Sequence, residues 1–228
     1  MDPNMWGEVA ATGTVTDDRV RSVAFALLSR LVSSPLDAGL ERTGLIPPDL
    51  SESLSALTAA LPYATDFTAL STAGRAALES GDKASEREYG AIFEVGRNGP
   101  PLPIRQELLF NETTSAQKKE EIVRYYDHFA YPLSPERQWA PDHLAVALEF
   151  QHFLTFRASE SSEHEPFLLA ARDFSARHLR DWTTMLAQTV AYKSEDAYLK
   201  TLFAAVAAFI AADLQHLEQR LRTQEPQA

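Results

Sequence analysis

The sequence predicts an all-α protein built as a single helical-bundle domain of about ten helices. Apolar residues recur at the three- and four-residue spacing of helices through most of the chain, whereas the strict alternation typical of a half-buried strand is absent. Clusters of proline and glycine divide the chain into helix-length segments. With 228 residues, of which 45% are hydrophobic, the chain can bury one substantial core.

The N-terminal half contains four predicted helices. Residues 1–16 are expected to form a mobile tail. Thr16 then has the side chain of a helix cap, with Asp17 and Asp18 suited to the first turn of a helix that should stop at Ser33–Pro35. The other predicted helices of this half are Asp49–Leu61, Asp66–Glu79 and Lys83–Val95.

Two segments rich in helix-breaking residues interrupt the middle of the chain. Residues 96–103 hold three prolines and two glycines, which excludes a helix and favours an extended conformation. A short helical turn at Arg105–Phe110 and a helix at Ser115–Phe129 follow. The second breaker segment, residues 130–141, also contains three prolines and is a hypothesised hinge between two halves of the domain.

The stretch from Gln138 to Phe156 is expected to lie at the centre of the bundle. Its apolar residues cover more than one stripe of a helix, which is typical of a helix buried on most sides. Asp142 is expected to cap this helix, because a carboxylate there accepts hydrogen bonds from the free amides of the first turn. Asp142 and His143 would then lie on the rim of a binding groove.

The C-terminal part continues the helical period to the end of the domain. The predicted helices are Pro166–His178, Leu179–Tyr192, which form one helix or a kinked pair, and Leu199–Leu221. The helical domain should therefore span residues 17–222, followed by a C-terminal tail at 223–228.

Composition narrows the classes of function. The formal net charge of −11 argues against a nucleic-acid-binding protein, which needs a basic face. The chain has no cysteine, which excludes a disulfide, a thiolate metal site and a cysteine nucleophile. The longest apolar run, Phe203–Ala212, is far shorter than the ~20 residues that span a bilayer. Without a signal pattern at its N-terminus, the protein is expected to be cytoplasmic.

Three stretches carry a resemblance to a known family. The sequence PDHLAVALEFQHFL, residues 141–154, resembles the signature of the TorD/DmsD/NarJ family of molybdoenzyme maturation chaperones. Tyr89–Phe110 resembles the family's aromatic helix followed by a proline-rich loop, and Phe174–Trp182 resembles a later helix. The resemblance spans roughly residues 20 to 215.

The resemblance implies a system-specific chaperone without catalytic residues or a bound cofactor. Its partner would be the catalytic subunit of a molybdenum-cofactor oxidoreductase, recognised through an N-terminal leader or twin-arginine signal peptide. The chaperone would assist folding, cofactor insertion and export of that subunit. A further partner implied in the same way is the cofactor-insertion machinery.

The residues expected to bind the leader peptide flank the two breaker segments. A leader is apolar and bears arginines, so the site needs apolar burial beside an acidic rim. Asp142 is the favoured contact for a client arginine. The complete set of expected peptide-binding residues is Tyr89, Phe93, Arg105, Glu107, Trp139, Asp142 and His143.

Two alternative functions remain open. Glu149 and His152 have the E-x-x-H spacing of di-iron bundles, so a helical-bundle metalloenzyme is one rival. Such a site needs a second E-x-x-H pair, and the nearest echo, Asp213 with His216, has the wrong acid. A generic helical adaptor is the other rival.

Overall fold

The all-α class is confirmed. A computed structural model of the chain describes residues 17–35, 44–80, 83–97, 99–109, 112–133 and 140–224, and within these ranges it contains helices but no strand. A single antiparallel bridge joins Arg105 to His143. The expected N-terminal tail at 1–16 lies outside the described residues, as does half of the hypothesised hinge, residues 134–139.

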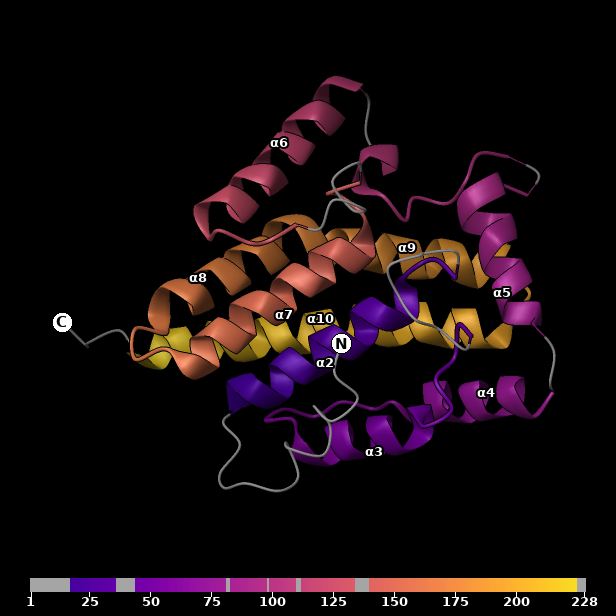
Figure 1. The fold of residues 1–228 in the computed structure, drawn as a ribbon, viewed down its shortest axis with the longest axis horizontal. Helices are drawn as coiled ribbons and strands as arrows, with labels where there is room; N and C mark the ends of the chain where they lie inside the picture. Colours follow the sequence, from indigo (N-terminus) through magenta and orange to yellow (C-terminus); the bar gives the residue numbers. More distant parts are fainter. Residues whose placement is uncertain are drawn as a thin grey trace.

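The observed helices follow the predicted order, with shifted ends. Figure 1 shows α7, α8, α9 and α10 with α2 forming the main bundle, α3 and α4 along one side of it, and α6 on the opposite side. The α-helices are α2 (Asp17–Val32), α3 (Leu50–Ala60), α4 (Thr68–Glu79), α5 (Ala84–Tyr89), α6 (Glu112–His128), α7 (Leu144–Glu160), α8 (Glu165–Phe174), α9 (Arg180–Lys193) and α10 (Ala197–Gln224).

Two predicted helices contain a π-helical segment that the sequence does not reveal. The helix expected at Lys83–Val95 is α5 followed by the π-helix η1, Gly90–Val95. The expected pair at 166–192 is α8 and α9 joined through the π-helix η4, Ser175–Leu179. The predicted turn after Arg105 is the 3₁₀ helix η2, Gln106–Leu109.

The centre of the bundle is the pair α2 and α7. Both helices are buried around most of their circumference, as expected for α7 from its apolar composition. Ser29 on α2 donates a hydrogen bond of 2.7 Å to the backbone carbonyl of Ala145, which requires the two backbones to lie close together. The α7 axis is therefore fixed by direct packing against α2 (Figure 1).

The helix α10 runs along the bundle and contacts α2, α4, α8 and α9. Among the described helices it alone has the length and hydropathy of a possible membrane span, over Ala197–Thr223. Half of the most apolar window is buried against the bundle, as in the core helix of a folded domain. The helix also continues to Gln224, two residues into the segment expected to be a tail.

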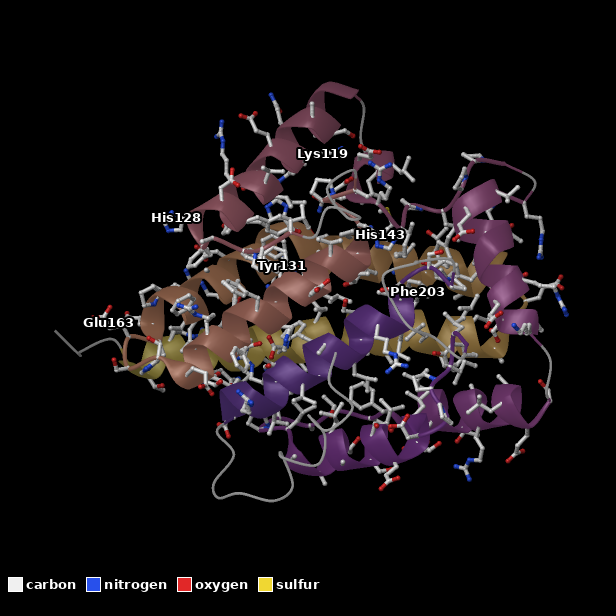
Figure 2. All side chains as sticks on the ribbon, viewed as in Figure 1. Lys119, His128, Tyr131, His143, Glu163 and Phe203 are labelled. Carbon is white, nitrogen blue, oxygen red and sulfur yellow. The ribbon has the colours of Figure 1, made fainter. Side chains whose placement is uncertain are left out.

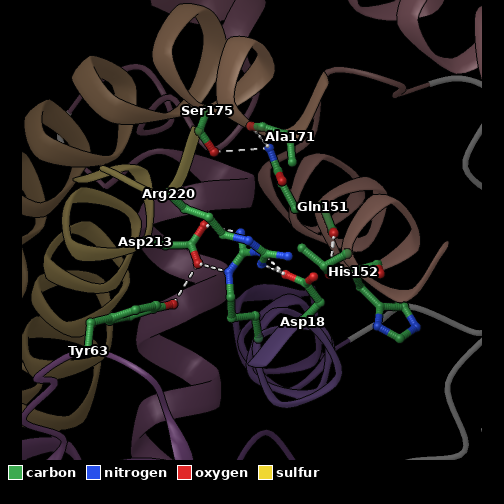
Figure 3. A network of polar contacts seen from close by, with 10 residues as sticks. Asp18, Tyr63, Gln151, His152, Ala171, Ser175, Asp213 and Arg220 are labelled. Carbon is green, nitrogen blue, oxygen red and sulfur yellow. Dashed lines mark hydrogen bonds and ion pairs between the residues drawn. The ribbon is translucent and has the colours of Figure 1, made fainter. Parts of the chain in front are cut away.

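A buried ionic network fastens α2 to α10 (Figure 3). Arg21 is fully buried and donates to both carboxylate oxygens of Asp213, at 2.6 and 2.9 Å, and to Asp18 at 2.7 Å. Tyr63 donates to Asp213 at 2.6 Å, and Arg220 donates to Asp18 at 2.7 Å. Burial alone would lower the pKa of Arg21, but the adjacent Asp213 carboxylate raises it above its usual value. The network therefore remains ionised.

Replacement of Arg21 should cost much more stability than replacement of its surface neighbour. Arg21→Met leaves the Asp213 carboxylate buried without its ionic partner, so we expect a loss of about 3–5 kcal/mol in the free energy of unfolding. Arg19→Met is the control on the same helix. Arg19 pairs with the exposed Glu160 at 3.0 Å, and its loss should cost less than about 1 kcal/mol. Equal urea midpoints for the two variants would contradict this account of the network.

Candidate functional site

A non-helical segment, residues 99–105, and the 3₁₀ helix η2 that follows it cross the end of the bundle where α7 begins. We call residues 99–109 the strap. Leu102, Ile104 and Gln106 are buried, with at most 8% of their surface exposed, whereas the side chains of Arg105 and Glu107 are 22% and 28% exposed. This alternation is that of an extended peptide with one face buried. The prolines of this stretch thus lie in a non-helical segment, as predicted from the sequence.

The strap is bound by backbone groups and side chains of three helical elements. Its partners are Ile92 in η1, His178 and Trp182 in the η4–α9 region, and Asp142 and Leu144 at the start of α7. We call these five residues the strap-binding surface. The bonds run from Leu102 N to Ile92 O at 2.8 Å, from Trp182 Nε1 to Pro103 O at 2.8 Å, from Leu144 N to Ile104 O at 3.0 Å, from Gln106 N to Asp142 O at 3.0 Å, and from Gln106 Nε2 to His178 O at 2.9 Å.

The cap of α7 differs from the prediction. His143, not Asp142, is the N-cap: its backbone is extended, with φ −73° and ψ 139°, and its Nδ1 accepts a hydrogen bond of 3.1 Å from Ala145 N. Both residues can cap a helix, but Asp142 lies one residue too early and faces the strap. The prediction that Asp142 caps α7 was therefore wrong.

Asp142 instead binds the strap. Its side chain is fully buried, and its Oδ2 accepts a hydrogen bond of 2.9 Å from Glu107 N. Its Oδ1 lies 3.5 Å from Arg105 Nη2, a long ion pair. A carboxylate removed from water needs such donors to satisfy its oxygens. Both of these donors belong to the strap.

Charged side chains form an outer layer over Asp142. Arg105 also pairs with Glu107, which in turn lies 3.5 Å from Lys119 on α6. In Figure 2, His143 lies at the start of α7 and Lys119 lies on α6. Ser115 on α6 donates to the carbonyl of Glu107 at 2.6 Å. The layer is partly exposed, so that ions and charged ligands can reach it.

A buried histidine lies beneath the middle of the strap. His178 Nδ1 is 3.3 Å from Oε1 of Gln106, and Tyr125 and Phe174 pack against its ring. Burial lowers the pKa of His178 to about 4, although the nearby Glu121 carboxylate favours the charged form. The imidazole is therefore neutral at pH 7.

The remaining expected site residues lie in different surroundings. Tyr89 and Phe93 are buried core residues with ring centroids 4.7 Å apart, and Tyr89 donates to the carbonyl of Val32 at 2.8 Å. Tyr89 ends α5 and Phe93 belongs to η1, and neither presents a free surface. Trp139 lies outside the described residues. The structure thus brings together four of the expected site residues. Arg105 and Glu107 belong to the strap, and Asp142 and His143 lie at the start of α7.

Four members of the strap-binding surface were not singled out as site residues: Ile92, Leu144, His178 and Trp182. Their helical spacing is that of ordinary core residues, and only the tertiary contact with the strap distinguishes them. A signal in the sequence is the apolar alternation of Leu102 and Ile104 between prolines, but it covers too few residues to stand alone.

The E-x-x-H pair does not form a metal centre within the described part of the chain. There, no group of three or more histidine, aspartate or glutamate side chains is placed to hold an ion. His152 instead contacts α2, with Nδ1 at 2.9 Å from the carbonyl of Ser22. Asp213, the acid of the second candidate pair, binds Arg21.

Comparison with protein families gives an extensive match. The sequence model described as "Nitrate reductase delta subunit" matches residues 46–188, which include the strap, η4 and α7. No solved structure matches the chain at a significant level.

Curated relatives share a common description. The chain is 31% identical over 106 residues to the chlorate reductase assembly chaperone protein of Ideonella dechloratans, covering 45% of this chain and 55% of the relative. It is 33% identical over 101 residues to the selenate reductase assembly chaperone protein of Thauera selenatis, covering 42% and 52%. The chain thus spans about half the length of these two relatives. The perchlorate reductase assembly chaperone protein of Dechloromonas aromatica (strain RCB) is 24% identical over 170 residues, covering 73% and 75%.

Stability should fall in mildly acidic solution because of His178. In the unfolded chain this histidine takes up a proton near its ordinary pKa of about 6.5, whereas the folded protein resists protonation until about pH 4. The contribution is fully present above about pH 6.5 and decreases as the pH falls to about 4. Urea titrations at pH 7 and pH 4.5 should differ by about 2 kcal/mol more in the wild type than in His178→Gln.

The exposed His128 on α6 provides a matched control for this titration. His128→Gln should retain the wild-type loss of stability between the two pH values. If His178→Gln retained it as well, the neutral buried state assigned to His178 would be wrong.

Proposed function

Because this chain belongs to the nitrate reductase delta subunit family, of the TorD/DmsD/NarJ type, we propose that it is an assembly chaperone for the catalytic subunit of a molybdenum-cofactor oxidoreductase. It binds the N-terminal leader or twin-arginine signal peptide of that subunit in the cytoplasm. It keeps the subunit competent for folding, cofactor insertion and export, and it performs no catalysis. The names of the three curated relatives, each an assembly chaperone of a reductase, support this role.

The observation that carries the proposal is the contact between the strap and the start of α7. It combines apolar burial with a buried carboxylate and an outer acidic group, which is the chemistry that an apolar, arginine-bearing peptide requires. Asp142 supplies the buried carboxylate and Glu107 the outer one. The net charge of −11 adds a long-range attraction for arginines.

The individual residues have separate roles in this proposal. Asp142 receives the client arginine, and His143 fixes the start of α7 beside it. Arg105 and Glu107 form the charged layer that the peptide rearranges. Tyr89 at the end of α5 and Phe93 in η1 pack in the core and so position Ile92. Trp139, which lies outside the described residues, remains an expected contact of the peptide.

The test of the function is capture of the client. A tagged form of this protein, expressed in its native host, should retain the catalytic subunit of one molybdenum-cofactor oxidoreductase. Deletion of the leader from that subunit should abolish retention. Recovery of unrelated proteins, with no such subunit among them, would favour the generic adaptor.

Charge attraction should be visible in the affinity of the leader peptide. Because exposed ion pairs are screened within a Debye length, a synthetic leader of the captured subunit should bind about three- to tenfold more weakly at 0.5 M than at about 0.05 M salt. Isothermal titration calorimetry measures both values. An affinity that does not change with salt would leave apolar contact as the only driving force and remove the charged layer from the site.

A further inference from the structure

We propose that the strap occupies the binding site of the client in the free protein, and that the leader peptide binds by displacing the strap from the strap-binding surface. This inference rests on the proposed function and adds the place and the manner of binding. The strap occupies a surface suited to a peptide: one face is buried at alternate residues, and its backbone bonds to neighbouring elements on both sides. Proteins recognise added peptide segments in this way through backbone bonds and alternate side-chain contacts.

The strap has the chemical features of the proposed client. It contains an arginine, Arg105, which follows the buried Leu102 and Ile104 and is separated from the exposed Leu108 by Gln106 and Glu107. The guanidinium of Arg105 approaches the buried carboxylate of Asp142. A leader peptide is likewise an apolar segment that bears arginine, so the two can use the same surface.

The buried carboxylate determines what can replace the strap. The backbone amide of Glu107 and the guanidinium of Arg105 are its donors, and both belong to the strap. Removal of the strap without replacement would leave the Asp142 carboxylate without either of these donors. A peptide that brings both a guanidinium and a backbone amide restores the lost bonds. An apolar peptide without arginine does not.

The strap is held in a way that permits exchange. Pro100, Pro101 and Pro103 have no amide hydrogen, which removes backbone donors from this part of the strap. The ion pair between Arg105 and Asp142 is long, at 3.5 Å, and Arg105 is shared with Glu107. A client arginine that binds Asp142 in a bidentate manner would form a shorter and stronger pair.

The turn that precedes the strap gives it a fixed point of attachment. Gly96 has φ +83°, and a Cβ atom there would lie 2.3 Å from the carbonyl oxygen of Gly99. The adjacent Arg97 is bound to Glu88, which also accepts hydrogen bonds from the α9–α10 connection at Ser194 and Glu195. The strap can therefore detach beyond this turn while η1 remains in place.

Hydrogen exchange on the unmodified protein tests the displacement. The probe is a synthetic peptide of the leader of the subunit captured as described above. On saturation with this peptide, the amides of Leu102, Gln106 and Glu107 should exchange at least about tenfold faster, because their bonds to Ile92 and Asp142 are broken. If the peptide binds and exchange in residues 99–109 is unchanged or slower, the inference is wrong while the proposed function stands. If the peptide does not bind, the proposed function fails.

A reversible disulfide lock, which joins the strap to the start of α7, provides a second test. Arg105 and His143 face each other as an antiparallel pair flanked by the bonds from Leu144 N to Ile104 O and from Gln106 N to Asp142 O. Such a pair has its Cα atoms about 4.5 Å apart, within the range that a disulfide bridges. The chain contains no cysteine, so Arg105→Cys with His143→Cys introduces a single thiol pair.

The lock is compared with its own reduced form, which carries the same two substitutions. Oxidation should weaken leader binding by at least about tenfold, and reduction should restore it, because a closed strap keeps the surface occupied. Equal affinities in the two redox states would show that the strap stays in place when the client binds. If both states bind too weakly to compare, the exchange experiment on the unmodified chain decides.

Discussion

The buried carboxylate of Asp142 is the constraint on which the arrangement around α7 depends. An ionised group without water must be supplied with donors, or its desolvation destabilises the fold by several kcal/mol. The donors come from Glu107 N and Arg105, so the strap must cross the start of α7 at this position. Its arrival there places η2, and through Ser115 and Lys119 it also orients the beginning of α6.

Two buried ionic contacts among the described residues, Arg21–Asp213 and Arg105–Asp142, differ in a way that matches different tasks. Arg21 binds Asp213 through two bonds below 3 Å and joins two long helices of the bundle. The Arg105–Asp142 contact is longer, partly exposed, and joins a helix to an extended segment. The first fixes the bundle permanently. In the second contact, as we propose, the guanidinium of a client can take the place of Arg105. That exchange is the property that a peptide-binding chaperone needs.

The sequence was sufficient for the helical class and for the order of the helices, because apolar periodicity is a local property that survives without tertiary information. The described residues of the 96–103 segment were also correctly excluded from helix, on the basis of its three prolines and two glycines. The cap of α7 was wrong because Asp142 and His143 are both suitable caps, and the strap, which is distant in sequence, decides between them. Tyr89 and Phe93 were placed in the site because helical spacing identifies a face but not whether that face contacts solvent or core. The π-helices η1 and η4 left no pattern in the sequence.

The most direct test of the account is a double-mutant cycle between Asp142 and the client arginine, measured by calorimetry. Asp142→Asn and a leader peptide with that arginine replaced by glutamine are combined singly and together. The cycle cancels the effect of Asp142→Asn on the strap itself and leaves the energy of the contact in the complex. Direct pairing predicts a coupling energy of about 1.5–3 kcal/mol. Effects that add to within about 0.3–0.5 kcal/mol would show that the arginine binds elsewhere, and would contradict the central claim.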